Sequence, residues 1–220
     1  MAKRIDELEE ADDKLLGLLH DPKIDDEIKE QRAKRKKMVD VVKNNRQFFL
    51  ETALVRHVEN YLNYLSSLLF EIFTQKPETL RSSEKIEITT VLDCENISDV
   101  VRVFAEKKVE NLSFSSIREL YDFFKERFKL KLFSEDLIPN VVEAIETRNI
   151  SVHNRCIINR RYISKTGSDS ELLGKRKDLN ITKLNEFVSI FLESVKILDQ
   201  KARSKLGIRG HRLRLGGEEK

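Results

Sequence analysis

The chain has 220 residues, of which 36% are charged and 40% hydrophobic, and it contains 7 Gly, 3 Pro and no Trp. So few turn-forming residues argue against a β-sandwich, a β-barrel or a propeller, which need a turn every roughly 8–12 residues. The net charge is +3, but residues 148–220 carry 17 Lys and Arg against 8 Asp and Glu. This basic third favours a polyanionic partner, and the composition as a whole predicts an all-α fold.

The N-terminal part of the chain predicts two charged helical segments and one core helix. A short acidic helix over residues 5–19 ends at Asp21-Pro22, because proline disfavours a helical conformation in the residue before it. From Asp25 a helical pattern continues to Pro77, and its first part includes the basic run at residues 32–37. The apolar residues of its second part recur at helical spacing and predict a core helix. They are Phe48, Phe49, Ala53, Leu54, Val58, Tyr61, Leu62, Leu65, Leu68, Leu69 and Ile72.

The middle of the chain predicts a polar link and two further helices. Residues 85–90 alternate in polarity and allow an extended stretch, but they do not support a sheet. A helix begins near Ser98. The next begins at Ser116, where Glu119 three residues later completes a capping box.

The C-terminal part predicts two more helices separated by a polar loop. The first begins near Ser134 and runs towards Ile158, and a loop at residues 167–170 and a basic cluster at residues 174–177 follow it. The last helix has a regular apolar stripe. Its members are Leu184, Phe187, Val188, Phe191, Leu192, Val195 and Leu198.

These elements predict an up-and-down helical bundle of four to five core helices. We expect the bundle to span residues 41–206, with a charged helical extension at residues 1–40 and a basic, disordered tail at residues 207–220. The N-terminus has no apolar core for a signal peptide, and no run of 18 apolar residues could span a membrane. The sequence therefore predicts a cytoplasmic protein with no membrane partner.

Metal and cofactor chemistry finds no support in the sequence. There is no Gly-rich phosphate loop, no H-E-x-x-H motif and no set of Cys and His ligands. Cys94 and Cys156 have no metal-ligand spacing, and we expect both to be reduced and buried. We therefore expect neither a metal nor another cofactor.

The most informative segment is EAIETRNISVHNR, residues 143–155, where polar residues interrupt the apolar stripe of the predicted helix. At 100° per residue, Glu146, Asn149 and His153 fall within about a 60° arc. Arg148 lies off that face, but its side chain is long enough to reach around the helix. A polar cluster that interrupts a core stripe costs stability unless its members are satisfied or used.

Arg148-Asn149-Ile150-Ser151-Val152-His153 resembles the R-N-x-x-x-H signature of HEPN domains (higher eukaryotes and prokaryotes nucleotide-binding), in particular of stand-alone ribonuclease-type HEPN proteins. Glu146 before the Arg and Asn154 after the His resemble the same family, and the resemblance covers about residues 41–206. A Tyr two residues after the His, found in the branch paired with nucleotidyltransferase antitoxins, is replaced here by Arg155.

The resemblance implies a metal-independent endoribonuclease that forms a homodimer, in which two motif helices face each other across one composite cleft. It also implies a toxin or phage-defence role, with an antitoxin or regulatory protein as a possible partner. Cleavage of RNA by its own 2′-OH leaves a 2′,3′-cyclic phosphate. It needs a base for the 2′-OH, an acid for the 5′-oxygen and a cation for the phosphorane.

These roles match the residue types of the motif. His153 suits acid–base work near neutral pH, and the planar guanidinium of Arg148 suits phosphate oxygens. Asn149 would orient His153 or the substrate, and Glu146 would hold the Arg or the His in position. The residues expected to contact the RNA backbone are Asn154, Arg155, Arg160 and Arg161. Tyr162 allows two interpretations, since its ring could stack on a base or pack in the core.

Two other interpretations remain open on the sequence. One is a catalytically silent HEPN-like module for dimerisation or for binding nucleotide or RNA. The other is a basic helical adaptor in which the motif is a buried polar cluster. In that case His153 would be an interface histidine, Arg148 would form a structural ion pair with Glu146, and Asn149 would be a buried hydrogen-bonded residue.

Overall fold

The computed structural model describes residues 8, 10–14, 22–81 and 87–208. These residues form helices joined by turns, which confirms the all-α prediction. Within them, β-type pairing is limited to one isolated bridge between Ile157 and Arg176. Most of the predicted first helix, part of the possible extended stretch and most of the basic tail lie outside the described residues.

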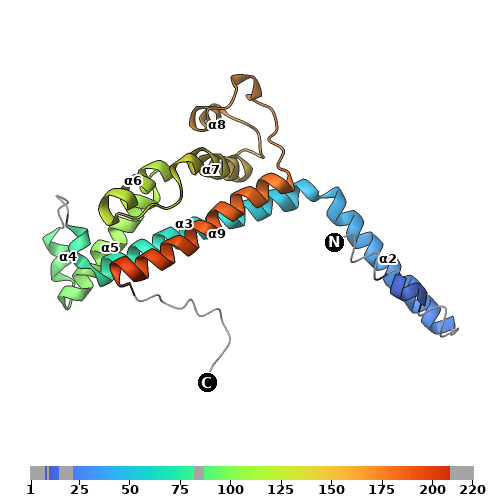
Figure 1. Cartoon of the computed structure of the whole chain (residues 1–220), viewed down its shortest axis with the longest axis horizontal. Coiled ribbons are helices and arrows are strands. Elements are labelled where there is room, and N and C mark those ends of the chain that lie inside the picture. The colour runs from blue at the N-terminus through green and yellow to red at the C-terminus, as the bar shows by residue number, and fades with distance from the viewer. Residues whose placement is uncertain (1–7, 9, 15–21, 82–86, 209–220) are drawn as a thin grey trace. The chain divides into compact units, whose positions relative to one another are not determined.

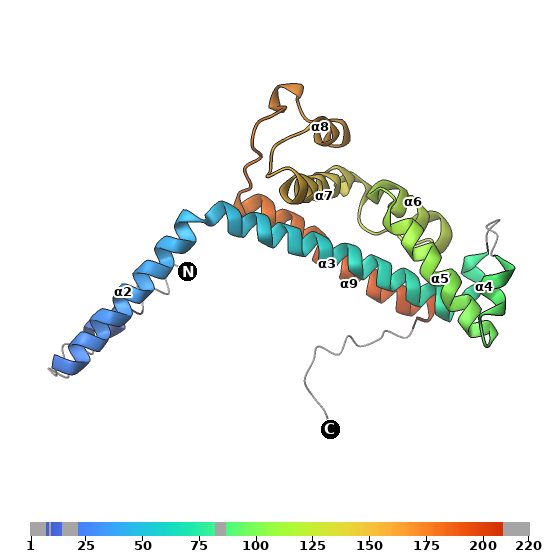
Figure 2. The same ribbon diagram turned by 180° about the vertical axis from the view of Figure 1, so that it is seen from behind.

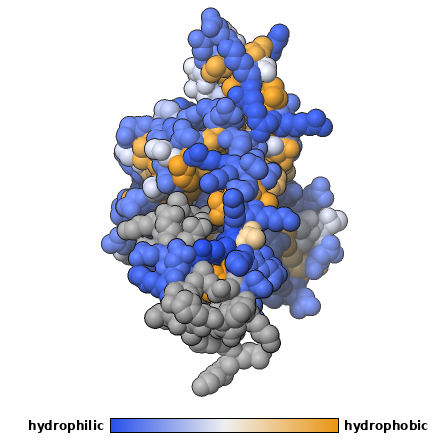
Figure 3. Space-filling view, turned by 90° about the vertical axis from the view of Figure 1, so that its right-hand side faces the viewer, coloured by the Kyte–Doolittle hydropathy of each residue, from blue (hydrophilic) through white to orange (hydrophobic). Residues whose placement is uncertain are grey.

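The chain divides into two compact units, Met1–Phe49 and Leu50–Lys220. None of the helices in the described part of the chain has the length and apolarity that a membrane crossing requires. The face drawn in Figure 3 is largely hydrophilic, and its hydrophobic side chains form small separate groups.

The long helical run predicted up to Pro77 is divided into two helices. They are α2 (Pro22–Asn44) and α3 (Arg46–Gln75), with a turn at Asn45 between them. The side-chain amide of Asn45 donates a hydrogen bond to the carbonyl of Val41 at 2.8 Å. The same carbonyl also accepts the regular helical bond from the Asn45 amide at 3.1 Å, so the side chain and the backbone of Asn45 share one acceptor at the turn. The prediction of one unbroken helix was therefore wrong at this residue.

The second unit is built on two long helices, α3 and α9 (Ile181–Leu206), which lie side by side (Figures 1 and 2). Tyr61 stacks on Phe191 with 4.6 Å between the ring centroids, and the Tyr64 hydroxyl donates to Asp199 Oδ1 at 2.7 Å. Since the contacts advance in the same sense along both helices, α3 and α9 run parallel.

Shorter helices carry the chain back between α3 and α9. They are η1 (Pro77–Leu80), α4 (Ile88–Leu92), α5 (Ile97–Ser113), α6 (Ile117–Phe128), η2 (Glu135–Leu137), α7 (Ile138–His153), α8 (Arg160–Thr166) and η3 (Ser170–Leu172). The extended conformation allowed for residues 85–90 is present at Glu87 and wrong for residues 88–90, which belong to α4. The predicted capping box of α6 is confirmed, because the Ser116 hydroxyl accepts from the Glu119 amide and the Glu119 carboxylate accepts from the Ser116 amide.

The helix that contains the motif ends earlier than predicted. It begins at Ile138, with Pro139 in its first turn, and ends at His153 instead of continuing towards Ile158. Arg155 and Cys156 have φ values of 51° and 62°. This left-handed region is incompatible with a continuing right-handed helix. The separate short helix α8 was not predicted.

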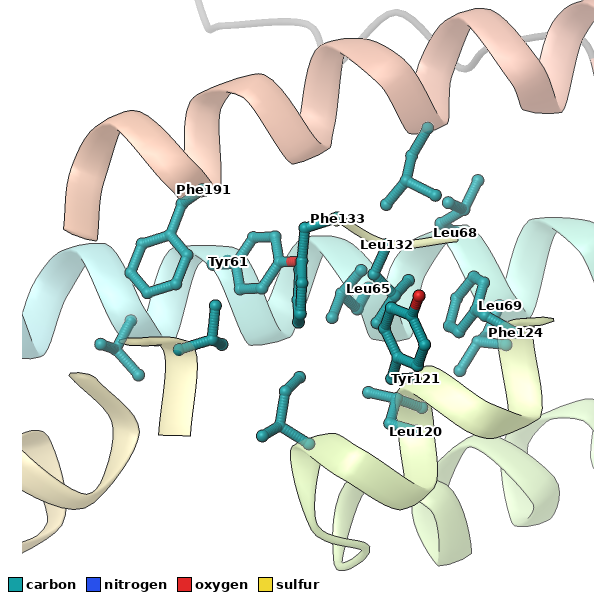
Figure 4. Packing of buried hydrophobic residues seen from close by; sticks show 14 of the residues in the cluster. Tyr61, Leu65, Leu68, Leu69, Leu120, Tyr121, Phe124, Leu132, Phe133 and Phe191 are labelled. Atoms are coloured by element: carbon teal, nitrogen blue, oxygen red, sulfur yellow. The ribbon is translucent and has the colours of Figure 1, made fainter. Parts of the chain in front are cut away.

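One hydrophobic cluster fills the space between α3, α9, α6 and the segment that follows α6. Figure 4 shows Leu65 and Leu69 of α3 facing Tyr121 and Phe124 of α6, with Phe133 beside them. Most of the predicted stripe of α3 is buried here. The buried members are Leu54, Val58, Tyr61, Leu65, Leu68, Leu69 and Ile72.

Three residues of the predicted apolar stripes are exposed. Phe48 and Phe49 precede Leu50, the first buried residue of α3, and Leu192 lies next to the buried Phe191 on α9. Periodicity identifies an apolar face, but the neighbouring element decides which residues at its edge are covered. The expectation for the cysteines was right for Cys156, which is free and buried, whereas free Cys94 is only partly buried.

Candidate functional site

The motif lies on the last two turns of α7, where polar residues enter a face that is otherwise buried. Ile138, Val141 and Ala144 pack into the main core, and Ile150 packs into a smaller cluster with Ile158. Between them the side chains of Glu146 and Thr147 are also buried. The polar interruption predicted from the sequence is therefore a feature of the folded helix.

Arg148 is held by a carboxylate from another helix. Its Nη2 donates to Glu59 Oε1 on α3 at 2.9 Å, and its Nη1 donates to Asn149 Oδ1 at 3.1 Å. The Arg148 side chain is 24% exposed and the Glu59 side chain 35%. Arg148 Nε is buried and has no hydrogen-bond partner within the described residues. The guanidinium is thus fixed in direction while part of its donor capacity is unused.

The contact with Asn149 brings Arg148 around the helix. Asn149 and His153 are four residues apart, so their side chains lie above one another on one face. The Arg148 guanidinium reaches this face through its hydrogen bond to Asn149. His153, the last residue of α7, is exposed, and its imidazole has no hydrogen-bond or ion-pair partner in the described part of the chain. Arg148 and Asn149 are therefore joined by a hydrogen bond, and helical geometry places His153 one turn further along the same face.

Glu146 does not belong to this group. Its side chain is buried, and Oε2 lies 3.4 Å from Nε of Arg161 on α8 without forming a hydrogen bond. Arg148 is directed away from it, towards Glu59. Glu146 therefore links α7 to α8, and the carboxylate that orients the arginine is Glu59.

The residues after His153 reverse the chain by backbone hydrogen bonds. The amides of Asn154 and Cys156 both donate to the Ile150 carbonyl at 2.9 Å. The Asn154 side chain donates to the Ile157 carbonyl at 2.6 Å, so its amide group is used within the turn. Arg155, between them, is exposed. The reversal presents the Arg155 side chain to solvent directly beside the end of the motif.

A hairpin-like excursion carries the remaining predicted RNA contacts. The amide of Ile158 donates to the Lys175 carbonyl, and the amide of Lys177 donates to the Cys156 carbonyl, so the two ends of the excursion are joined. Arg160 and Arg161 open α8 and are exposed. Tyr162 is fully buried against Ile150 and Ile158, which makes it a packing residue and excludes base stacking in this conformation.

Ion pairs hold this excursion against α7 and α3, and a further pair joins α7 to α9. Lys177 Nζ lies 2.8 Å from Glu143 Oε1 on α7, and Lys183 Nζ on α9 lies 3.2 Å from the other carboxylate oxygen. Arg176 Nη2 lies 2.6 Å from Glu51 Oε1 on α3. Burial alone would raise the pKa of Glu143, but the hydrogen bonds from Lys177 and Lys183 outweigh it and hold that pKa below its ordinary value. The carboxylate therefore stays ionised at neutral pH.

Sequence reasoning missed Glu59 and Glu51, the two acidic residues of α3 that pair with this region. They are eight residues apart and so lie on one face of α3. A pair of acids at this spacing beside a buried stripe indicates a polar edge of the helix. The spacing cannot identify the cation that pairs with each acid, because the partner is distant in the sequence: Arg148 is 89 positions from Glu59.

No group of three or more His, Cys, Asp or Glu side chains that could hold a metal ion gathers within the described residues. Comparisons with known proteins provide no relative: no protein-family model, no curated protein and no solved structure matches the chain. The hydrogen-bonded pair Arg148 and Asn149, with the exposed His153 one turn further along α7, forms the candidate site.

Proposed function

We propose that this protein is a metal-independent endoribonuclease whose active site forms at a homodimer interface. The observation that supports this most is the grouping at the end of α7. A guanidinium oriented by Glu59 and Asn149 reaches the face that carries the exposed imidazole of His153. The resemblance of this segment to the HEPN signature supports the same proposal.

The proposed reaction needs only groups that this arrangement offers. One His153 takes the proton of the RNA 2′-OH as the 2′-oxygen forms a bond to phosphorus. As the bond from phosphorus to the 5′-oxygen breaks, a protonated His153 from the second chain donates a proton to that oxygen. The products are a 2′,3′-cyclic phosphate and a 5′-OH. A dimer supplies both proton transfers from one histidine per chain.

Arg148 would stabilise the negative charge that develops on the phosphorane. Its guanidinium is permanently charged and offers parallel N–H donors to the non-bridging oxygens. Glu59 and Asn149 would act as positioning residues, because they hold the guanidinium and not the substrate. A side chain already fixed loses less conformational freedom when the phosphate binds.

The exposed cations beside the motif would bind the RNA backbone. Arg155, Arg160 and Arg161 lie at the start of the excursion that follows His153. Contacts of this kind give affinity that falls with salt and little preference for sequence. Following the resemblance, we extend the proposal to a toxin or phage-defence effector that acts on RNA in the cytoplasm and is restrained by an antitoxin or regulatory protein.

One observation favours a second candidate, a catalytically silent dimerisation or nucleic-acid-binding module. The Glu59 carboxylate already pairs with Arg148 and reduces the positive charge that a phosphorane would meet. If that pair persists when RNA binds, Arg148 contributes to structure and not to the transition state.

The two candidates are separated by cleavage of mixed-sequence RNA in EDTA. We expect the wild type to cut and to leave 2′,3′-cyclic phosphate ends. Loss of His153 as acid and base should lower the rate about 10²- to 10⁴-fold in His153→Ala. Loss of the cation should lower it about 10²- to 10³-fold in Arg148→Ala. The matched controls are His57→Ala and Arg102→Ala, which remove exposed side chains elsewhere and should leave the rate unchanged.

Folding must be measured on the same samples. Arg148→Ala breaks a partly exposed ion pair, which is worth at most about 1 kcal/mol, so the melting temperature should change little. A folded dimer that binds RNA but does not cut it, with or without His153, would contradict the ribonuclease proposal and support the silent module.

A further inference from the structure

The N-terminal unit contains a second cluster of arginines, far in sequence from the motif and already occupied by the chain's own carboxylates. Asp12 lies on a short helical stretch at residues 10–14. Its Oδ2 is 3.4 Å from Arg32 Nε and also accepts a hydrogen bond from Arg35. Asp13 Oδ1 accepts from Arg32 Nη2 at 2.6 Å. Two guanidiniums from successive turns of α2 thus converge on two neighbouring carboxylates.

This contact differs from the other ion pairs of the unit. The pairs Lys14–Glu10, Lys29–Asp26 and Lys34–Glu30 each join residues three or four positions apart, and all their side chains are more than 60% exposed. The Asp12 side chain, by contrast, is only 16% exposed and joins residues about twenty positions apart in the sequence. Helical spacing alone explains the three lysine pairs. The contacts of Asp12 instead fix a carboxylate from a distant part of the sequence between Arg32 and Arg35.

The arginine cluster has donor capacity that two carboxylates do not use. Arg35 Nε is buried and has no hydrogen-bond partner in the part of the chain that is described. A guanidinium binds a phosphate group through two parallel N–H groups. A nucleic-acid strand carries a phosphate at every nucleotide, so one strand could contact both arginines. Lys36 and Lys37 continue the positive charge on the same stretch of α2 and are exposed.

We propose that Arg32 and Arg35 form a binding site for the phosphodiester backbone of RNA, and that Asp12 and Asp13 cover this site until RNA displaces them. The choice of RNA as ligand rests on the proposed function, but the binding is separate from the chemistry because no residue of α7 takes part. We call Arg32 and Arg35 together the covered arginine site. It would add a salt-sensitive contact for the substrate in the N-terminal unit.

The test measures RNA binding without cleavage, in the full-length His153→Ala protein. The probe is a fluorescein-labelled mixed-sequence single strand, followed by fluorescence anisotropy at several salt concentrations. Asp12→Asn/Asp13→Asn should uncover the site and lower the Kd about tenfold at low salt. Two additional phosphate contacts should steepen the dependence of log K on log salt by about 1.4.

A matched control removes the same charge from the same unit. Asp26→Asn/Glu27→Gln changes two exposed acids of α2 that do not touch the covered arginine site, and it should change the Kd less than about twofold. An equal gain in RNA affinity in this control would show that the effect depends on net charge alone, and would overturn the proposal. The proposal would also be overturned if the Asn variant kept its gain in affinity after Arg32→Ala/Arg35→Ala was added.

Two further measurements make the test decisive. Hydrogen exchange of the His153→Ala protein, with Asp12 and Asp13 intact, should rise at residues 10–14 and fall at residues 29–37 when RNA is added. Unchanged exchange in both segments would overturn the proposal even if the Asn variant did not fold. Vesicles containing about 30% phosphatidylserine present anionic lipid in place of RNA. An Asn variant that gains affinity for these vesicles and not for RNA would overturn the choice of ligand.

Discussion

Ser194 closes a buried hydrogen-bonded chain between α3, α9 and the segment after α6, and its removal should be unusually costly. The Ser194 hydroxyl donates to the Leu132 carbonyl at 2.5 Å and lies 2.7 Å from the Tyr61 hydroxyl. Since its one proton is used for Leu132, Ser194 accepts the proton of Tyr61. Burial raises the pKa of Tyr61 well above its ordinary value, so the phenol stays protonated and able to donate.

Substitutions of Ser194 and Tyr61 in this series of hydrogen bonds should cause different losses of stability. Ser194→Ala leaves two buried groups unpaired, the Tyr61 hydroxyl and the Leu132 carbonyl, and each costs about 1–3 kcal/mol. Tyr61→Phe removes one incoming bond and leaves the bond from Ser194 to Leu132 intact, which costs about 1 kcal/mol. We therefore expect Ser194→Ala to lower the free energy of unfolding by about 2–6 kcal/mol, clearly more than Tyr61→Phe.

A double-mutant cycle by urea unfolding, followed by circular dichroism, measures the coupling. In the Ser194→Ala background the Tyr61 hydroxyl is already unpaired, so Tyr61→Phe should cost nothing further or restore some stability. Ser189→Ala, an exposed serine on the same helix, is the control and should be neutral. If Tyr61→Phe costs the same in both backgrounds, the two hydroxyls act independently and the chain described here is refuted.

Two further predictions concern the excursion and the dimer. The pKa of Glu143 in the folded protein lies below its ordinary value of 4.5. The ion pairs of Glu143 with Lys177 and Lys183 therefore stabilise the fold fully above pH 4.5, and this stabilisation is lost as the pH falls through the lowered pKa. Thermal unfolding of Glu143→Gln should therefore show a lower Tm at pH 7 and a flatter decline below about pH 4.5; parallel curves for the two proteins would contradict this. The proposed mechanism needs both histidines of a dimer. When wild type is mixed and re-equilibrated with His153→Ala, RNA cleavage should therefore fall as the square of the wild-type fraction, and a linear fall would show that each chain cuts alone.

Local signals in the sequence were sufficient for most of the helices. The capping box at Ser116 and the apolar periodicity of α3 and α9 act between residues a few positions apart, so they can be identified without a structure. The end of α7 could not be found in this way. Its left-handed residues, Arg155 and Cys156, are of types that do not favour that conformation, and backbone hydrogen bonds to Ile150 hold the turn.

The candidate site shows the same division between local and distant information. The positions of Arg148, Asn149 and His153 on α7 follow from helical geometry, including the reach of Arg148 towards the histidine face. The pairing of Arg148 with Glu59 depends on how α7 packs against α3, which no local pattern encodes. The packing of α7 against α8 likewise places Glu146 beside Arg161, a pairing that no local pattern encodes.

The excursion between Cys156 and Lys177 carries exposed cations on a segment that is joined to the bundle at its two ends. Its ends are joined by backbone hydrogen bonds, which do not depend on the side chains between them. Changes in the length of a loop with fixed ends cost little in entropy. Arg155 and Arg160 are exposed and can therefore vary while α3, α7 and α9 keep their packing. Arg161 is different, because its guanidinium faces the buried carboxylate of Glu146. At Arg155 and Arg160, the proposed contacts with RNA are separable from the stability of the fold, so either property can change through selection or engineering without loss of the other.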